Sequence, residues 1–395
     1  MRCKTAVFLL LPMLFAVAQA AIPVKAAAQE IKFTEMAQPF EMPSSRAYGG
    51  GGYHAAFADD LSALFANPAA LSSIPGQISI AELTLSACGL SMVEMFADYF
   101  FQTGDKTYLT ELQQSQKNAI DLGGPLGLAL AYKGFGFGAY NVVRSNITWT
   151  DETIRRPRPE FSTEFIILAG YGLTMFDTGT ARGEIGLSLK FLYRTIQASL
   201  ASLQGVQYFI ETLNDHMMET QIGFGADAGM RFEFGTFSVG LVIHDPYSPI
   251  FADHYKNKKS YENGTVLESA TLTVQPRLAM GIAWCPPPPF WRHINTDFTL
   301  TRDYRDILSV LDATARDPLL ELSAGFEVTL KKTFSFRAGF FEMLPAAGLG
   351  INFGLFKLDA SIFMLESGLV VWEAPSLAFS ISFLWRYPFP PVRDE

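Results

Sequence analysis

The stretch from Gln221 to Phe234 alternates between apolar residues on one parity and glycine, polar or charged residues on the other. Because successive side chains of a β-strand point to opposite faces, this stretch predicts a strand with one wholly apolar face. The apolar parity consists of Ile222, Phe224, Ala226, Ala228, Met230, Phe232 and Phe234. The other parity includes Gly223, Gly225, Asp227, Gly229, Arg231 and Glu233. The pattern recurs down the chain behind a secretory signal, a combination that predicts a β-barrel in an outer membrane.

The first residues have the layout of a secretory signal peptide. A basic start is followed by the apolar run Ala6–Val17 and by the small-residue cleavage site Ala18–Ala20. The apolar run is too short for a membrane-spanning helix, which needs about 20 residues. We therefore expect residues 1–20 to be removed. Residues 21–43 are polar and without a clear period, and we expect them to form a periplasmic lead.

The composition agrees with a membrane barrel. Charged residues make up 17% of the chain, below the roughly 25% that is usual for soluble domains. The mean hydropathy is positive at +0.17, yet no apolar stretch of membrane-helix length follows the signal. Apolar character spread over many short segments is typical of spanning strands. The net charge of −9 argues against a nucleic-acid partner.

About 14 segments behind Gly76 alternate or are laced with glycine at strand length. They are roughly 78–86, 125–133, 136–144, 163–173, 182–194, 219–234, 236–244, 271–284, 291–302, 319–330, 333–341, 346–354, 356–365 and 376–387. Short connections alternate with long ones, which is the expected asymmetry of an outer-membrane barrel. The long ones are 87–124, 145–162, 195–218, 245–270, 303–318 and 366–375, and helical spacing occurs within 105–119, 198–213 and 303–315. We therefore predict an all-β fold, a transmembrane antiparallel barrel over residues 77–387, with a periplasmic tail at 388–395.

Motifs that would indicate an enzyme are missing from the sequence, which has no G-x-S-x-G elbow, H-E-x-x-H pair or phosphate loop. The five histidines are scattered. Cys88 and Cys285, the two cysteines behind the signal, fall at opposite ends of the predicted barrel. We therefore expect no catalysis, no cofactor, no bound metal and no structural disulfide.

Charged residues also fall on the parity that should face the barrel lumen. They are Glu184, Lys190, Arg194, Asp227, Arg231, Glu233, Glu321, Glu327 and Arg337. Since both signs occur, mutual pairing is favoured over a selectivity ring of one sign. Lumen-facing glycines such as Gly223, Gly229 and Gly348 remove side-chain volume from the interior, which suggests that another part of the chain fills that space.

Residues 44–76 are the candidate occupant, because a barrel of this size encloses more room than its own side chains fill. Four consecutive glycines, Gly49, Gly50, Gly51 and Gly52, would let the segment run close to the wall. The run from Ala55 to Leu71 contains Asp59, Asp60 and the motif Asn67, Pro68 and Ala69. This run resembles the N-terminal hatch of the long-chain fatty acid transporter family (FadL-like), whose looser relatives include a group of spirochaetal barrel paralogues.

The resemblance implies an outer-membrane transporter in which Asn67-Pro68-Ala69 is the hatch motif and Asp59-Asp60 its acidic flank. A hydrophobic ligand would be captured from outside, pass the hatch, and leave through a wall defect into the membrane or onward to the periplasm. The glycine-rich stretch Gly134–Gly138 is the candidate for a weakened ladder. Residues of the first long loop would either line an access groove or pack that loop onto the rim; they are Met95, Phe96, Phe100 and Phe101.

Passive transport of long-chain fatty acids or similar hydrophobic molecules is therefore the first hypothesis. The expected partners are a hydrophobic small molecule and outer-membrane lipid, and the barrel is expected to be a monomer. The alternative is a surface scaffold or carrier barrel that docks other exported proteins and has no need of a continuous apolar cavity. A general diffusion porin is disfavoured by the plug and by the mixed lumen charge.

Overall fold

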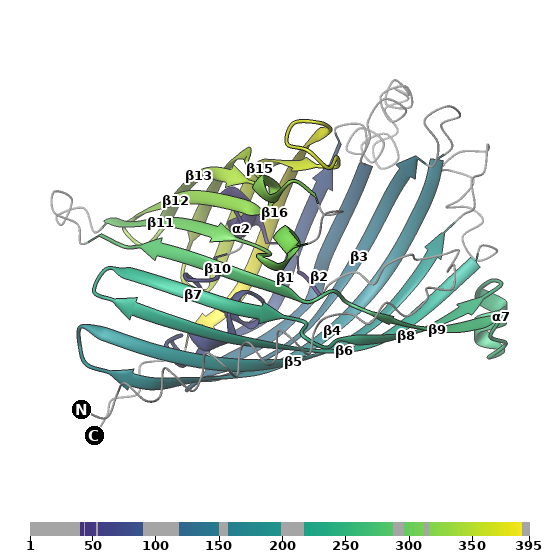
Figure 1. The fold of residues 1–395 in the computed structure, drawn as a ribbon, viewed down its shortest axis with the longest axis horizontal. Helices are drawn as coiled ribbons and strands as arrows, with labels where there is room; N and C mark the ends of the chain where they lie inside the picture. Colours follow the sequence, from purple (N-terminus) through teal and green to yellow (C-terminus); the bar gives the residue numbers. More distant parts are fainter. Residues whose placement is uncertain are drawn as a thin grey trace.

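The computed structural model describes residues 40–42, 44–52, 54–89, 118–149, 157–198, 217–286, 296–311 and 316–388 (Figure 1). Its main feature is a closed antiparallel barrel of 14 strands. These are β1 Gln77–Cys88, β2 Asn118–Tyr132, β3 Phe135–Trp149, β4 Pro157–Asp177, β5 Ala181–Ala198, β6 Met217–Phe234, β7 Phe237–His244, β10 Arg277–Trp284, β11 Thr296–Tyr304, β12 Leu322–Leu330, β13 Phe334–Phe341, β14 Leu344–Asn352, β15 Phe356–Glu366 and β16 Pro375–Pro388. The barrel closes where β1 pairs with β16.

A hairpin outside the barrel order interrupts the step from β7 to β10. Strand β8 (Pro249–Tyr255) pairs with the outer part of β6, and β9 (Glu268–Thr273) pairs with β8. The helix α7 (Lys258–Glu262) connects these two strands. The expectation of one strand over 271–284 after a loop over 245–270 is therefore wrong. Proline has no N–H for a ladder, and β9 and β10 end and begin on either side of Pro276.

The wall is taller on one side than on the other. Strand β4 has 21 residues and β5 and β6 have 18 each, whereas β10 and β13 have 8. About 9–11 residues suffice for a spanning strand, so the long strands extend beyond a membrane on one side (Figure 1). The sequence predicts only 163–173 of β4, because the polar ends of this strand lack a clean alternation.

In two places where the sequence predicts a helix or a strand, the structure has a 3₁₀ helix. The expected helix over 303–315 is wrong at its start, where β11 continues to Tyr304, and the described part contains a single 3₁₀ helix at Leu308–Leu311. The start of the strand predicted from 319 is also a 3₁₀ helix, Pro318–Glu321, with Asp317 accepting from the Leu319 N–H. The predicted helical stretches 105–119 and 198–213 lie outside the described residues except at their ends, where 118–119 belong to β2 and 198 to β5, so the expectation is wrong at those ends.

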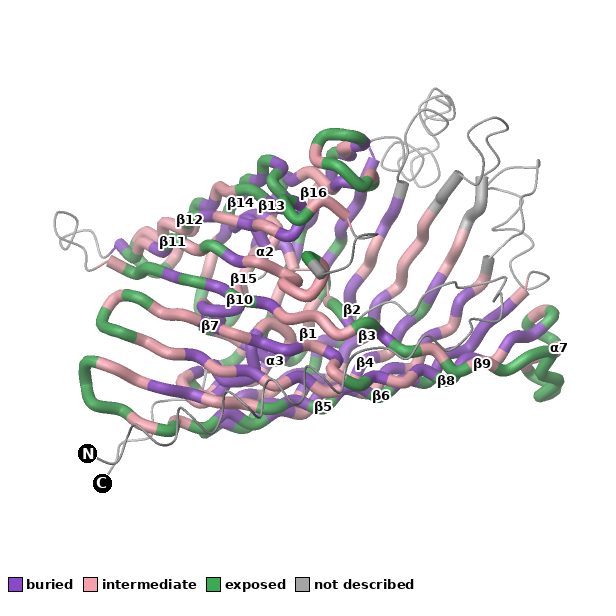
Figure 2. Tube along the Cα trace, in the orientation of Figure 1, coloured by how far each residue is buried: buried purple, intermediate pink, exposed green. Residues whose placement is uncertain are grey.

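The outward and inward faces alternate as the sequence predicts. The outward side chains Phe224, Leu189 and Leu349 are 50%, 60% and 57% exposed, whereas Gln221 and Asp227 on the inward parity are buried. Figure 2 shows buried and more exposed residues alternating along the strands of the barrel. The outer face of the barrel is thus apolar, whereas the inner face combines charged and polar residues with a buried apolar cluster that includes Ile166, Leu168 and Leu192. Within the described residues, no helix is long and apolar enough to cross a membrane.

Residues 44–76, called the N-terminal segment below, lie inside the barrel (Figure 1). The segment contains α2 (Ser45–Gly49), α3 (Ala63–Ala66) and the 3₁₀ helix η1 (Pro68–Ser72). Helix α2 packs against β13–β16, while η1 packs against β3–β6 on another part of the wall. The expected signal peptide and most of the expected lead lie outside the described residues.

Candidate functional site

A row of three wall glycines receives the second half of the N-terminal segment. Gly172, Gly186 and Gly229 are direct ladder partners on β4, β5 and β6. A Cβ atom on Gly172 would lie 2.6 Å from the Ser72 nitrogen and 2.8 Å from the Pro68 oxygen. A Cβ on Gly186 or Gly229 would likewise overlap residues of the motif. Only glycine therefore permits η1 to lie this close to the wall.

Asn67 fixes the turn that η1 begins. Its side chain is fully buried, and its Nδ2 donates to the carbonyl of Ala55 at 2.7 Å and to that of Met230 at 3.2 Å. Its Oδ1 accepts from the Ala69 N–H at 3.0 Å, which caps the 3₁₀ helix. Pro68 occupies the first helical position, where a missing N–H costs nothing. The motif is therefore bonded both to the segment itself and to β6.

The glycines Gly49–Gly52, in the first half of the N-terminal segment, also lie close to the barrel wall. A Cβ on Gly49 would lie 2.8 Å from the Gly348 Cα, and one on Gly51 or Gly52 would overlap Ala324 or the Phe341 ring. Gly51 and Gly52 also have positive φ angles of 89° and 91°, a conformation that glycine adopts without strain. The Gly50 carbonyl in turn lies against Gly325, where a Cβ would overlap it.

The acidic flank of the motif is tied to the wall by ion pairs. Arg46 of α2 pairs with Asp59, with Asp60 at 3.0 Å and with Glu327 of β12 at 3.2 Å. Lys357 of β15 lies 3.5 Å from Asp60. Burial by itself raises the pKa of Asp60, but Lys357 and Arg46 outweigh it and hold that pKa well below its usual range. The segment is therefore held electrostatically as well as by close packing.

The lumen charges form pairs and small networks. Glu184 pairs with Arg231 at 2.7 Å, and Lys190 reaches both Asp227 and Asp245 at 2.8 Å. The remaining pairs are Arg194–Glu164, Arg231–Glu233, Arg305–Glu321, Arg337–Glu327 and Arg337–Asp359. Glu321 lies in the 3₁₀ turn ahead of β12, and Glu233 is the most exposed of the group.

Sequence reasoning missed several partners in these networks. Glu164 and Asp359 are buried on inward positions of β4 and β15, so the alternation within their strands could have identified them. Asp245 follows the end of β7 with a φ of 50° and carries no periodic signal. Glu41, from the expected lead, pairs with Arg277 at 2.6 Å. Burial raises the pKa of Glu41, but the Arg277 and Arg305 guanidiniums outweigh it and lower that pKa to about 2.

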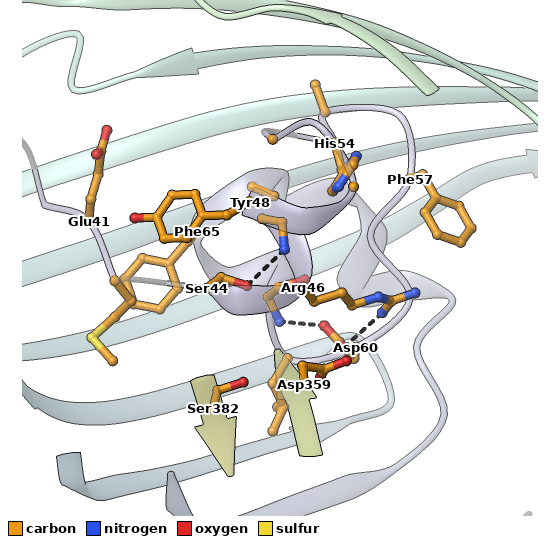
Figure 3. Close-up of a pocket in the computed structure, with 18 of the residues that line it drawn as sticks. Glu41, Ser44, Arg46, Tyr48, His54, Phe57, Asp60, Phe65, Asp359 and Ser382 are labelled. Carbon is orange, nitrogen blue, oxygen red and sulfur yellow. Dashed lines mark hydrogen bonds and ion pairs between the residues drawn. The ribbon is translucent and has the colours of Figure 1, made fainter. Parts of the chain in front are cut away.

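A cavity of about 430 Å³ lies between the N-terminal segment and the wall (Figure 3). Figure 3 shows α2, with Arg46 and Tyr48, on one side of it, and Asp359 and Ser382 on strands of the wall. Aromatic lining comes from Phe65 of the segment and Tyr140 of β3, whose ring centroids are 5.4 Å apart. A second cavity of about 300 Å³ lies below the segment, beside the turn at Gly235.

The ladder between β1 and β2 is interrupted beside the first cavity. The two strands pair at Ser79 and Ala129 and again at Thr84 and Gly123, with a shift of register between these points. Within the shift, Gly124 has a φ of 95°, and Pro125 has no N–H to donate. Glu82, which lies in the interrupted part of β1, lines the cavity.

Strand β3 partly repairs the interruption through a side chain. The Asn141 Nδ2 donates to the Gly124 carbonyl at 2.8 Å, and its Oδ1 accepts from the Leu126 N–H at 2.9 Å. The stretch Gly134–Gly138, which the sequence suggested as the weak part of the wall, is regularly paired, because β3 and β4 keep one register throughout. The irregularity instead centres on residues 124–126 of β2, because the pairing of β2 with β3 also shifts between Gly123 and Gly127.

The cysteines, the metal-ligating side chains and the suggested access residues were also considered in the sequence. Cys88 and Cys285 are both free thiols. In the described part of the chain no cluster of metal-ligating side chains occurs. The suggested access residues Met95, Phe96, Phe100 and Phe101 lie outside the described residues.

A closed antiparallel barrel with an apolar outer face and charged residues in its lumen leaves no open sheet edge within a bilayer, and this is the fold of outer-membrane proteins. The chain is therefore a transmembrane β-barrel of the outer-membrane class.

Comparison with known proteins gives matches among solved structures. The toluene transporter TodX of Pseudomonas putida is 11% identical, with 90% of this chain and 100% of that chain covered and a TM-score of 0.43. The monoaromatic hydrocarbon channel CymD is 12% identical, with 87% and 98% covered and a TM-score of 0.42. A FadL homologue of Pseudomonas aeruginosa is 12% identical, with 89% and 100% covered and a TM-score of 0.41. No protein-family model and no curated protein matches the sequence.

Proposed function

We propose that this protein is a passive outer-membrane transporter of hydrophobic small molecules, with the N-terminal segment as its hatch. The observation that carries the proposal is the cavity of about 430 Å³ that lies between that segment and the wall. Ligand pockets commonly measure about 300–1,000 Å³, so the cavity is large enough for a small ligand. The sequence resemblance of residues 55–71 to the FadL-like hatch supports the same assignment, and long-chain fatty acids are one candidate cargo.

The route that we propose runs from the mouth to the cavity and then to the interruption between β1 and β2. The N-terminal segment lies across the lumen below the cavity and would prevent direct passage to the periplasm. Glu82 lies both in the interrupted stretch and on the cavity surface. A ligand released there would enter the bilayer, where apolar burial stabilises it by about 25 cal/mol per Å².

Binding by the refolded mature protein tests the proposal. A fluorescent hydrophobic probe is titrated in detergent and displaced with unlabelled alkyl compounds of increasing chain length. Saturable binding with displacement that improves with chain length is expected. A well-folded barrel with no saturable binding would refute transport through this cavity.

A variant of the hatch motif separates the role of the segment from that of the cavity. In Asn67→Gly/Pro68→Ser/Ala69→Gly, the bonds from Asn67 to Ala55 and Met230 are lost, and the leak of small solutes from liposomes should rise. Heat-modifiable mobility checks that the barrel is still folded. An unchanged leak from a folded barrel would contradict the hatch assignment.

The second candidate is a surface scaffold that docks other exported proteins. The one-sided extension of the wall by β4–β6, β8 and β9 favours it, because strands project there beyond the length that a membrane needs (Figure 1). A pull-down of exported proteins, with this barrel as the bait, tests the scaffold function. Removal of the hairpin 245–274 should abolish any capture that depends on the extension.

A further inference from the structure

The basic side chains of the first cavity are already occupied by carboxylates. Arg277 holds Glu41 at 2.6 Å, and Lys357 lies 3.4 Å from Asp359. The other two basic side chains of the lining are Arg46, which pairs with Asp59, Asp60 and Glu327, and Arg305, which pairs with Glu321 and Glu342. A ligand carboxylate would therefore have to displace a carboxylate of the protein to gain a cation.

Acidic groups outnumber basic ones on the surface of this cavity. Four basic side chains face seven carboxylates, which are Glu41, Asp60, Glu82, Asp121, Glu327, Glu342 and Asp359. His54 does not restore the balance, because burial and the nearby Arg46 lower its pKa to about 4 and leave it neutral at pH 7. Arg144, Arg316 and Arg337 lie behind the lining and pair with Asp121, with Glu342, and with both Glu327 and Asp359. Most of the lining carboxylates are therefore already paired, and the four basic side chains of the lining have no capacity left over for a ligand.

Glu82 is the carboxylate with the fewest partners. Within the described part of the chain, it has neither an ion pair nor a hydrogen bond of its side chain. It lines the cavity near Tyr140, and the charged side chains that act on it are Asp60, Lys357 and Asp359, which are already engaged with one another or with Arg46 and Arg337. Its place in the interrupted stretch of β1 puts that charge at the exit that we propose.

We propose that this cavity rejects anionic head groups and selects uncharged hydrophobic molecules. A carboxylate ligand would lose its hydration, find no free cation, and meet the unpaired carboxyl group of Glu82. An uncharged alcohol or hydrocarbon of the same length buries the same apolar area without these costs. The inference rests on the proposed transport function and narrows its cargo, since it places ionised fatty acids among the disfavoured ligands.

A head-group series at constant chain length tests the inference. The refolded mature protein in a non-ionic detergent is loaded at pH 7.5 with N-phenyl-1-naphthylamine, an uncharged probe, which is then displaced by decan-1-ol, decanoate or decylammonium. Decan-1-ol should compete at least tenfold better than decanoate. Preference for decylammonium over decanoate would also support rejection of anions. Equal or better competition by decanoate would overturn the inference and leave transport itself standing.

A matched pair of variants separates the cavity charge from partition into detergent. Glu82→Gln should improve competition by decanoate several-fold and leave that of decan-1-ol unchanged. Glu262→Gln, on the exposed helix α7 far from the cavity lining, should change neither value. A decanoate-to-decanol ratio that is the same in all three proteins would refute the role of Glu82. Absence of saturable probe binding by folded wild-type protein would instead refute the proposed function.

Discussion

Substitution of Gly172 by alanine should loosen the N-terminal segment without opening the barrel. The new Cβ would lie 2.6 Å from the Ser72 nitrogen, 2.8 Å from the Pro68 oxygen and 2.9 Å from the Ala69 oxygen. Ordinary van der Waals contact begins at 3.4 Å, so η1 must withdraw from the wall by about 0.8 Å. All three atoms are backbone, and no side-chain rotation can relieve the overlap.

The energetic cost follows from that displacement. Overpacking of a well-packed site costs about 1–3 kcal/mol, and each Asn67 hydrogen bond that breaks as η1 moves costs about 1 kcal/mol more. Since about 1.4 kcal/mol corresponds to a tenfold change in an equilibrium constant, the displaced form of the segment should become roughly 10–100-fold more populated. The leak of a small solute from liposomes should rise by a similar factor.

Gly223→Ala on β6 is the matched control. Its Cβ would lie 3.0 Å from the Ile250 Cγ1 and 3.2 Å from the Phe40 Cζ, both atoms of side chains that can adjust. The control should leak at the wild-type rate, with both variants showing normal heat-modifiable mobility. Equal leak from Gly172→Ala and Gly223→Ala would refute the view that wall glycines seat the segment.

Two further predictions concern the outer face and the pH dependence. Phe224→Arg places a charge on the outward face, where Phe224 is 50% exposed, and should destabilise the barrel by roughly 2–4 kcal/mol near the midplane of the membrane. Urea unfolding in lipid vesicles measures this loss of stability. A tolerated charge would mean that residue 224 faces the lumen. The pKa of His54 is lowered by burial and by Arg46 to about 4 from 6.5, so its contribution to stability is present above pH 6.5 and is lost as the pH falls toward 4. Between pH 7 and pH 5 the His54 contribution falls by an amount on the order of 2 kcal/mol, so over that window solute leak should rise more in the wild-type protein than in a variant without the imidazole. His54→Asn keeps a residue that tolerates the φ of 65° and should abolish this additional rise; a leak that rises equally in both proteins would exclude His54 as its cause.

Several features of the wall could be predicted from the sequence because they depend on local periodicity. The alternation of apolar and inward residues at Gln221–Phe234 gives the strand, its two faces and its membrane side, since the period of two belongs to each strand alone. The number of barrel strands follows from the same pattern. The hairpin of β8 and β9 was missed because both strands are short and β9 contains no buried residue that would mark an inward face.

The segment inside the barrel was only partly accessible to sequence reasoning. The motif Asn67–Ala69 stands out as a short run with a capping residue and a proline, which is local information. The motif packs against Gly172, Gly186 and Gly229, which come from three strands. These glycines lie side by side because of the register among β4, β5 and β6. No local pattern in any one of those strands contains that coincidence.

The sequence by itself determined that this protein is an exported, antiparallel membrane barrel with charges of both signs in its lumen, because strand parity is a property of neighbouring residues. Only the tertiary structure decided which carboxylate pairs with each basic side chain and that Glu82 remains unpaired among the described residues. It also decided that the ladder is interrupted between β1 and β2 rather than at Gly134–Gly138. These outcomes depend on the register between strands and on where the N-terminal segment meets the wall. Both are set by contacts between residues far apart in the chain, which no periodicity encodes.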